Sequence, residues 1–472
     1  MTSHVPHRLA LAWAFAQAWV GKGASTLVYV ALGYLLPPQE FGAYAVAATF
    51  LVLAEMFVEQ SIAQTAIQLH DGHTQTIQDL HGVAFLLGGA CACGSLLMAF
   101  ATYFLYPTST IPAYSAALAV CPALIGLNAV PLGLLRKAMD YKILTLRSAW
   151  ATIFAGALGI ITASITSNGW ALVVMSITYQ LVSWVLLRKY RPKVALPIQL
   201  QDSRQIKHLL LLNSHPKIAD FIETKGLELL AANILGLHIA GALTYANKIA
   251  QTAFTFLISP TIDTAWGQFA RLRANAEPAF HSYKSMSAML TMLGLPAFCI
   301  LSAASYDFLP HLLGGKWLLL RDLLPLFCLG LLIRGPLYLS TVMAQVIRPN
   351  KFLSTLALIR SALTLGLGGL LMTFYGHNAT AVIGFCLAGF LVIPATMQTM
   401  ISLDKRVATD LRNQTVFLTL SFAVVSLLQM WVNHVVNPAN TTYLIFTLGV
   451  SAVAAMTLSC LRHLDMLRKI IS

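Results

Sequence analysis

Ionisable side chains inside long apolar stretches are the residues of this sequence that could do chemistry. Three of them are cations: Lys22, Lys248 and Arg334. Lys and Arg are the usual protein partners of phosphate, because their N–H groups donate charge-assisted hydrogen bonds to its oxygens. Each cation could equally belong to an interhelical ion pair that holds neighbouring helices together, so both interpretations stay open.

Carboxylates in the same kind of apolar stretch could have a second role, the binding of a proton or Na⁺. The best placed are Glu55, Asp220 and Glu223. A carboxylate in a cavity that opens alternately to two aqueous sides can couple transport to an ion gradient. The alternative is that these groups only neutralise nearby lysines, such as Lys217 and Lys225.

Other reactive residue types are expected to be structural. Arg147 and Arg360 lie within about two turns of the ends of their apolar stretches, from which long side chains reach back to the membrane interface. The histidines between residues 70 and 81 fall at or beside a short polar segment, where scattered histidines are commoner than a metal site. The seven cysteines lie in apolar segments without a CxxC pair. We therefore expect no catalytic residue, no metal and no other cofactor.

Membrane helices must position these residues, because the composition excludes a soluble globular domain. Of the chain, 57% is hydrophobic and 10% is charged, and the mean hydropathy is +0.73. Since a helix needs about 20 mostly apolar residues to cross the hydrocarbon, the apolar runs predict about fourteen spans. They lie near 9–36, 41–66, 80–106, 111–135, 143–166, 169–187, 209–235, 240–268, 285–306, 322–346, 352–375, 378–402, 414–435 and 441–461.

The distribution of basic residues orients these helices. The formal net charge is +13, but the Lys and Arg residues lie in short segments between apolar runs, which does not indicate nucleic-acid binding. With the N-terminus in the cytoplasm, most of the 30 Lys and Arg residues fall on the cytoplasmic side, and only Lys316 and Arg321 lie in external segments. By the positive-inside rule, this asymmetry predicts an even number of spans with both termini cytoplasmic.

The two halves of the chain resemble each other weakly but in order, as in transporters built from repeats. Segments 41–45 and 240–244 each open a predicted helix, and the sequence around Pro131 is echoed around Pro336. We predict an all-α polytopic membrane protein made of two parallel six-helix repeats plus two C-terminal helices. Its predicted parts are an N-terminal six-helix lobe at 1–190, a cytoplasmic linker at 191–208, a C-terminal six-helix lobe at 209–405 and two additional helices at 406–472.

Five short segments carry a family resemblance. They are 36–44 (LPPQEFGAY), 61–68 (SIAQTAIQ), 131–142 (PLGLLRKAMDYK), 234–248 (ILGLHIAGALTYANK) and 312–317 (LLGGKW). In this order they resemble the landmarks of Wzx-like and WzxC-like polysaccharide transporters, a branch of the multidrug/oligosaccharidyl-lipid/polysaccharide (MOP) superfamily. Ser61 departs from the pattern, because the family usually has glycine there. The resemblance covers about twelve predicted helices and implies a fold like that of MATE and MurJ transporters.

The resemblance implies a flippase that moves polyprenyl-diphosphate-linked oligosaccharide across the bacterial inner membrane by alternating access. Such a protein would serve exopolysaccharide, capsule or lipopolysaccharide synthesis, and its partners would be membrane lipids and the polymerase and glycosyltransferases of that pathway. The cargo diphosphate would make Lys22, Lys248 and Arg334 substrate-binding residues of a cavity. A MATE-like multidrug or cation antiporter is the alternative. A membrane glycosyltransferase or polymerase is disfavoured, because no long external loop carries a pair of carboxylates.

Overall fold

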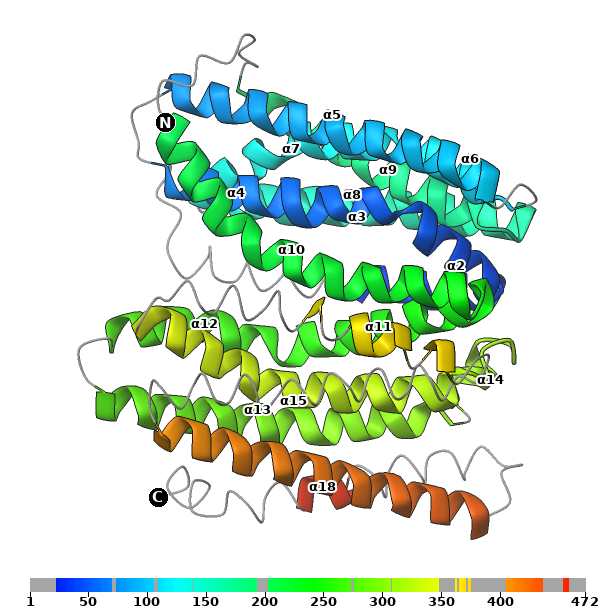
Figure 1. The fold of residues 1–472 in the computed structure, drawn as a ribbon, viewed down its shortest axis with the longest axis vertical. Helices are drawn as coiled ribbons and strands as arrows, with labels where there is room; N and C mark the ends of the chain where they lie inside the picture. The colour runs from blue at the N-terminus through cyan, green and yellow to red at the C-terminus, as the bar shows by residue number, and fades with distance from the viewer. Residues whose placement is uncertain are drawn as a thin grey trace. The chain divides into compact units, whose positions relative to one another are not determined.

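The computed structural model shows the chain as a set of long α-helices (Figure 1). It describes residues 23–69, 74–105, 109–138, 140–192, 203–272, 276–306, 308–347, 361–362, 365–370, 372–374, 405–435 and 453–457. Backbone packing divides the chain into two compact units, Met1–Gly241 and Ala242–Ser472.

The first unit is a bundle of helices. After a helix at Gly23–Leu35, its elements are α2 (Pro38–Ala47), α3 (Thr49–Leu53), the π-helix η1 (Ala54–Glu59), α4 (Gln60–Gln68), α5 (Thr74–Leu105), α6 (Ile111–Leu118), α7 (Val120–Lys137), α8 (Tyr141–Thr166), α9 (Trp170–Leu187), the 3₁₀ turn η2 (Arg188–Tyr190) and α10 (Ser203–Ile234). Helix α7 packs against α4, α5 and α9, and α8 pairs with α9 (Figure 1). Helix α10 lies against α2 and α4.

Small residues let the central helices approach closely. A Cβ atom added at Gly88 on α5 would lie 2.6 Å from the Pro122 carbonyl oxygen, and one at Gly126 on α7 would lie 2.5 Å from the Ala84 carbonyl oxygen. Neither distance leaves room for a side chain, so α5 and α7 meet backbone to backbone. Close contacts of this kind hold helices together in a bilayer, where the hydrophobic effect does not drive helix association.

The second unit has its own core. Its elements are the main part of α11 (Leu237–Leu257), then α12 (Ser259–Arg271), α13 (Ala276–Ala304), α14 (Phe308–Leu312), α15 (Leu320–Ile347) and α18 (Lys405–Val435). The rings of Tyr245 and Trp317, both fully buried, lie 4.2 Å apart. Polar contacts tie α13 to α18: Ser287 hydrogen-bonds Gln414, and the Gln429 amide donates to the Cys299 carbonyl over 3.2 Å.

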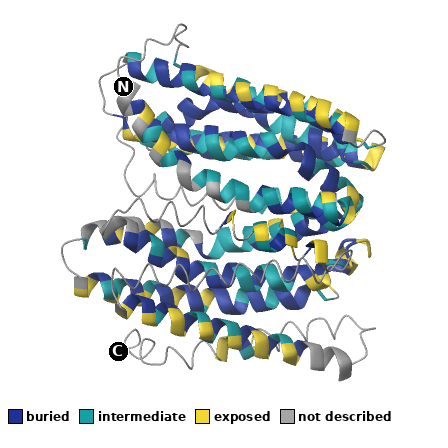
Figure 2. Cartoon of the chain, in the orientation of Figure 1, coloured by how far each residue is buried: buried dark blue, intermediate teal, exposed yellow. Residues whose placement is uncertain are grey.

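Exposed side chains on the long helices are largely apolar, as a lipid-facing surface requires. On α5 they include Leu97, Phe100 and Phe104, and on α8 they include Ile161 and Ile165. Figure 2 shows exposed residues recurring along single faces of α5 and α18 while the opposite faces are buried. Within the described residues, eight helices are long and apolar enough to cross a membrane. An all-α polytopic membrane architecture is therefore confirmed, whereas the predicted number of fourteen spans stays a prediction.

Where the chain is described, the helices lie near the predicted spans, but three of these spans are interrupted. The span predicted at 41–66 is interrupted at Ala48, between α2 and α3. The span predicted at 240–268 is interrupted at Ile258, because Pro260 lies in the first turn of α12 and disfavours a continuous helix before it. The span predicted at 111–135 is interrupted at Ala119. Most of the spans predicted at 352–375, 378–402 and 441–461 lies outside the described residues.

The unit boundary at Gly241 differs from the linker at 191–208 that the repeat predicts. The packing of α10 against α2 and α4 explains this, because it groups α10 with the helices that precede it in the chain. The division into two six-helix repeats with a linker at 191–208 stays a prediction.

Candidate functional site

A π-helical segment, η1, places two carboxylates in the first unit. It interrupts the apolar helix that runs from α3 to α4, and the Gln60 amide donates to the Glu55 carbonyl five residues earlier, as π-helical geometry requires. Such an insertion turns the side chains beyond it relative to a regular α-helix, and π segments are frequent at functional sites. Glu55 and Glu59 both lie on this segment and are partly buried.

Helix α9 presents a polar stripe that meets η1. Ser176, Gln180 and Ser183 follow one another at spacings of four and three residues, which puts them on one helical face. The Gln180 amide donates to Glu55 Oε1 over 3.4 Å. The Ser176 hydroxyl lies 2.7 Å from the hydroxyl of Tyr44 on α2. The stripe thereby joins α9 to both α2 and η1.

Arg147 on α8 extends this polar network. Its side chain is 8% exposed, and its guanidinium donates to the Ser183 hydroxyl over 2.7 Å. Tyr179, next to Gln180 on α9, lies within electrostatic reach of Arg147, Glu55 and Glu59. The expectation that Arg147 reaches the membrane interface is wrong, because its side chain is buried inside the bundle and donates to Ser183 there. A cation and two carboxylates therefore share one polar region, which we call the α8–α9–η1 network.

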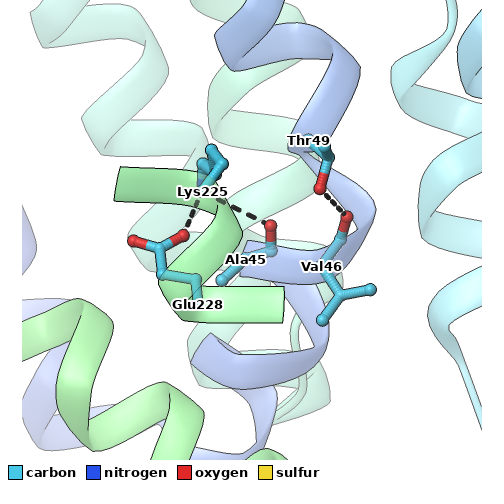
Figure 3. Close-up of polar contacts among 5 residues, drawn as sticks. All are labelled: Ala45, Val46, Thr49, Lys225 and Glu228. Atoms are coloured by element: carbon cyan, nitrogen blue, oxygen red, sulfur yellow. Dashed lines mark hydrogen bonds and ion pairs between the residues drawn. The ribbon is translucent and has the colours of Figure 1, made fainter. Parts of the chain in front are cut away.

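A second charged group lies where α10 meets α2. Lys225 and Glu228, one turn apart on α10, form an ion pair and are both buried. The Lys225 ammonium also donates to the Ala45 carbonyl over 3.5 Å, and Figure 3 shows the three residues together. Thr49 donates to the Val46 carbonyl over 2.7 Å beside the turn between α2 and α3. Each charge has a partner, so this junction is suited to holding α10 in place.

The predicted site residues fall in different parts of the structure. Glu55 belongs to the α8–α9–η1 network, and Asp220 is partly buried on α10. Lys248 is exposed on α11 and Arg334 is partly buried on α15, both in the second unit. Lys22 and the side chain of Glu223 lie outside what the structure describes. The grouping of Lys22, Lys248 and Arg334 around one cavity stays a prediction.

Several members of the network were not predicted from the sequence: Tyr44, Ser176, Gln180 and Ser183. A usable signal was present in the spacing of the three α9 residues, which put polar side chains on one face of an otherwise apolar span. No comparable signal indicates η1, because nothing in the composition of residues 54–59 distinguishes a π-helix from an α-helix.

The fold is shared with solved membrane transporters. A lipid II flippase, MurJ, in an inward closed conformation matches with a TM-score of 0.69 at 12% identity, over 97% of this chain and 99% of that chain. An inward-facing multidrug resistance MATE family transporter of the MOP superfamily matches with a TM-score of 0.62 at 15% identity, over 84% of this chain and 99% of that chain. A MOP superfamily transporter from Pyrococcus furiosus gives 0.56 at 15% identity, over 84% of this chain and 96% of that chain. These matches show that the chain has the fold of these transporters.

Sequence gives the narrower assignment. The profile of the family described as "Polysaccharide biosynthesis protein" matches residues 31–322, and the chain belongs to that family. The resemblance expected from the five sequence landmarks is confirmed. No curated protein matches the chain as a close sequence relative. The family is described by polysaccharide biosynthesis, and the fold is one that solved transporters and a flippase share.

Proposed function

We propose that this protein is a flippase that moves polyprenyl-diphosphate-linked oligosaccharide across the bacterial inner membrane by alternating access. The match of residues 31–322 to a polysaccharide biosynthesis family carries the proposal. Similarity in fold to a lipid II flippase over 97% of the chain supports it. The product would enter exopolysaccharide, capsule or lipopolysaccharide synthesis, and both chain termini would lie in the cytoplasm, as the positions of the basic residues predict.

The charged head of such a cargo determines what the protein must supply. A diphosphate that leaves water needs donors to replace its hydration, and Lys and Arg provide the strongest ones. Lys22, Lys248 and Arg334 are our candidates for that role. An ionisable residue within a span costs about 2.5–3.5 kcal/mol on insertion scales, so retaining three such cations calls for a cavity or a partner.

Coupling to an ion gradient is assigned to carboxylates, with Glu55 as the leading candidate and Asp220 and Glu223 as further ones. Glu55 accepts a hydrogen bond from the neutral amide of Gln180, a contact that is compatible with either protonation state of the carboxyl group. It also lies on a π segment, where a shift in the helical hydrogen-bond register can turn its side chain. Binding of a proton or Na⁺ at Glu55 would then bias the packing of η1 against α9.

The experiment that tests the function is deletion of the gene, with two measurements on the same cells. Surface and secreted polysaccharide should be lost, while the lipid-linked oligosaccharide unit is still made and accumulates. Normal polymer in the deletion strain would overturn the proposal. Loss of the lipid-linked unit itself would also overturn it, because that result would place the protein in synthesis rather than in translocation.

A MATE-like multidrug or cation antiporter is the second candidate, favoured by the fold match to a multidrug resistance MATE family transporter. The same deletion distinguishes the two functions. An extruder predicts unchanged polymer together with increased sensitivity to cationic dyes, whereas the flippase predicts lost polymer and unchanged dye sensitivity.

A further inference from the structure

One polar cluster of the first unit lies outside the network described above. Arg191 follows η2 at the end of α9, and its guanidinium contacts both α7 and α9. It donates to the Asn128 side-chain oxygen over 3.4 Å and to the Trp184 carbonyl over 2.7 Å. The same guanidinium lies 4.8 Å from the centre of the Trp184 ring. His81 on α5 lies within electrostatic reach of Arg191. We call these four residues the Arg191 cluster.

The cluster holds more hydrogen-bond donors than the chain satisfies. Within the part of the chain that the structure describes, no partner is found for Arg191 Nε, Asn128 Nδ2, Trp184 Nε1 or either ring nitrogen of His81. Asn128 is 1% exposed and His81 is fully buried. A buried polar group left unpaired costs about 1–3 kcal/mol. Unpaired donors gathered around one guanidinium indicate a bound acceptor.

Charge at the cluster indicates the kind of acceptor. No ion pair joins Arg191 to a carboxylate in the described residues. Burial lowers the pKa of Arg191, which reflects the cost of a partly desolvated cation. Lys225, the buried cation of α10, instead has Glu228 as its counter-charge. The Arg191 cluster therefore combines a net positive charge with unused N–H donors, the combination that binds an oxyanion.

The position of the cluster indicates where the anion comes from. Arg188 and Lys189 are exposed three and two residues before Arg191, and Arg136 and Lys137 end the neighbouring helix α7. Such a concentration of basic residues marks the cytoplasmic end of the helices, where the phosphates of anionic lipids lie. We propose that the Arg191 cluster binds a phosphate oxyanion, supplied by the headgroup of an anionic phospholipid of the cytoplasmic leaflet. This binding is separate from the transported cargo.

The test measures lipid binding to the purified full-length protein by native mass spectrometry. Phosphatidylglycerol is titrated against phosphatidylcholine, which carries the same phosphate but no net charge, and inorganic phosphate is added in a third arm. Wild-type protein should bind phosphatidylglycerol at least about tenfold more tightly than phosphatidylcholine, as expected for charge-assisted contacts. Arg191→Gln should abolish that preference, and Arg191→Lys should reduce it, because Lys keeps the charge but loses the guanidinium fork.

Arg188→Gln is the matched control, since it removes the same charge from an exposed residue three positions earlier. It should keep most of the lipid preference. Equal losses in Arg188→Gln and Arg191→Gln would overturn the proposal, because they would show diffuse surface attraction only. Absence of any preference in the wild type would overturn it as well. Inorganic phosphate should compete with phosphatidylglycerol in the wild type but not in Arg191→Gln, which would show that the headgroup phosphate is the recognised group. If inorganic phosphate binds through Arg191 but the protein shows no lipid preference, the ligand is a free anion and the lipid assignment is overturned.

If Arg191→Gln fails to reach the membrane, Arg191→Lys and Asn128→Leu supply the same comparison. Asn128→Leu retains volume and removes only the amide, and it should weaken phosphatidylglycerol binding by about three- to tenfold. Unchanged binding in both variants would overturn the proposal.

Discussion

Lys225 and Arg191 are both buried or partly buried cations of the first unit, and their surroundings differ. Lys225 has a carboxylate one turn away and a backbone carbonyl from α2, so the α2–α10 junction neutralises its own charge. Arg191 has an amide oxygen, a carbonyl and an aromatic ring, and no counter-charge in the described residues. A buried charge that is balanced within the chain serves packing, whereas one that is not is available to a ligand. The two classes of charge respond differently to substitution.

The largest effect is expected at the α2–α10 junction. Lys225→Met leaves Glu228 as an uncompensated buried charge, which costs about 3–5 kcal/mol. Membrane abundance and the thermal unfolding temperature in detergent should both fall sharply. Replacing both partners, as Lys225→Met with Glu228→Leu, should restore stability, because a well-packed apolar pair is often neutral or stabilising.

Lys217→Met is the control for this experiment, since Lys217 lies on the same helix and is only partly buried. It should change stability by less than about 1 kcal/mol. If the Lys225→Met, Glu228→Leu double variant is as unstable as Lys225→Met alone, the ion pair does more than neutralise charge. The contrast drawn between Lys225 and Arg191 would then be wrong.

An intermediate effect, on transport rather than on stability, is expected for the proposed cargo-binding cations. Lys22→Gln or Arg334→Gln removes a charge-assisted contact worth about 1.5–3 kcal/mol, which is roughly a ten- to hundredfold loss of affinity. Polymer export should fall while immunoblots show near-normal protein. If these cations are structural, abundance falls instead and a second change, Glu55→Gln or Glu223→Gln, restores it. Normal export from a stable Lys22→Gln, Arg334→Gln double variant would remove both residues from the cargo site.

The smallest effect on stability is expected at Glu55. Glu55→Gln keeps the shape of the side chain and an oxygen that accepts from Gln180, so the unfolding free energy should change by less than about 1 kcal/mol. Export should nevertheless lose its dependence on the proton or sodium gradient, measured with selective ionophores. Glu59→Gln serves as the control, because Glu59 makes no hydrogen bond or ion pair within the described residues. Gradient dependence that persists in Glu55→Gln would assign coupling to another carboxylate.

Hydropathy predicts much of this fold because a bilayer leaves few choices to the backbone. Apolar runs such as those of α5 and α8 must be helical, since every backbone amide inside the membrane needs an internal partner. The breaks at Ala119 and Ile258 and the π segment at Ala54–Glu59 were not predicted, because they occur inside runs whose average hydropathy stays that of a span. Local backbone geometry of this kind depends on packing.

The candidate site was less predictable than the fold. Glu55 was recognised because a carboxylate in an apolar span is conspicuous in any sequence. Arg147 was misplaced, because proximity to a helix end does not reveal that Ser183 on α9 lies within hydrogen-bonding distance of it. Lys225 pairs with Glu228 one turn along the same helix, whereas its contact with the Ala45 carbonyl depends on how α10 packs against α2. Contacts with other helices, such as Arg147 with Ser183 and Lys225 with the Ala45 carbonyl, cannot be read from a single sequence.

The claim of flipping is tested most directly with purified protein in proteoliposomes. A polyprenyl-diphosphate oligosaccharide is placed in both leaflets, and a membrane-impermeant oxidant that attacks its sugars is added outside. In protein-free vesicles only the outer-leaflet half is modified, whereas a flippase should bring nearly all of the lipid-linked sugar within reach of the oxidant. The account predicts that result, with slower access for Arg334→Gln. The proposed flippase function would be contradicted if only the outer-leaflet half is modified in vesicles that contain folded wild-type protein and are supplied with the ion gradient.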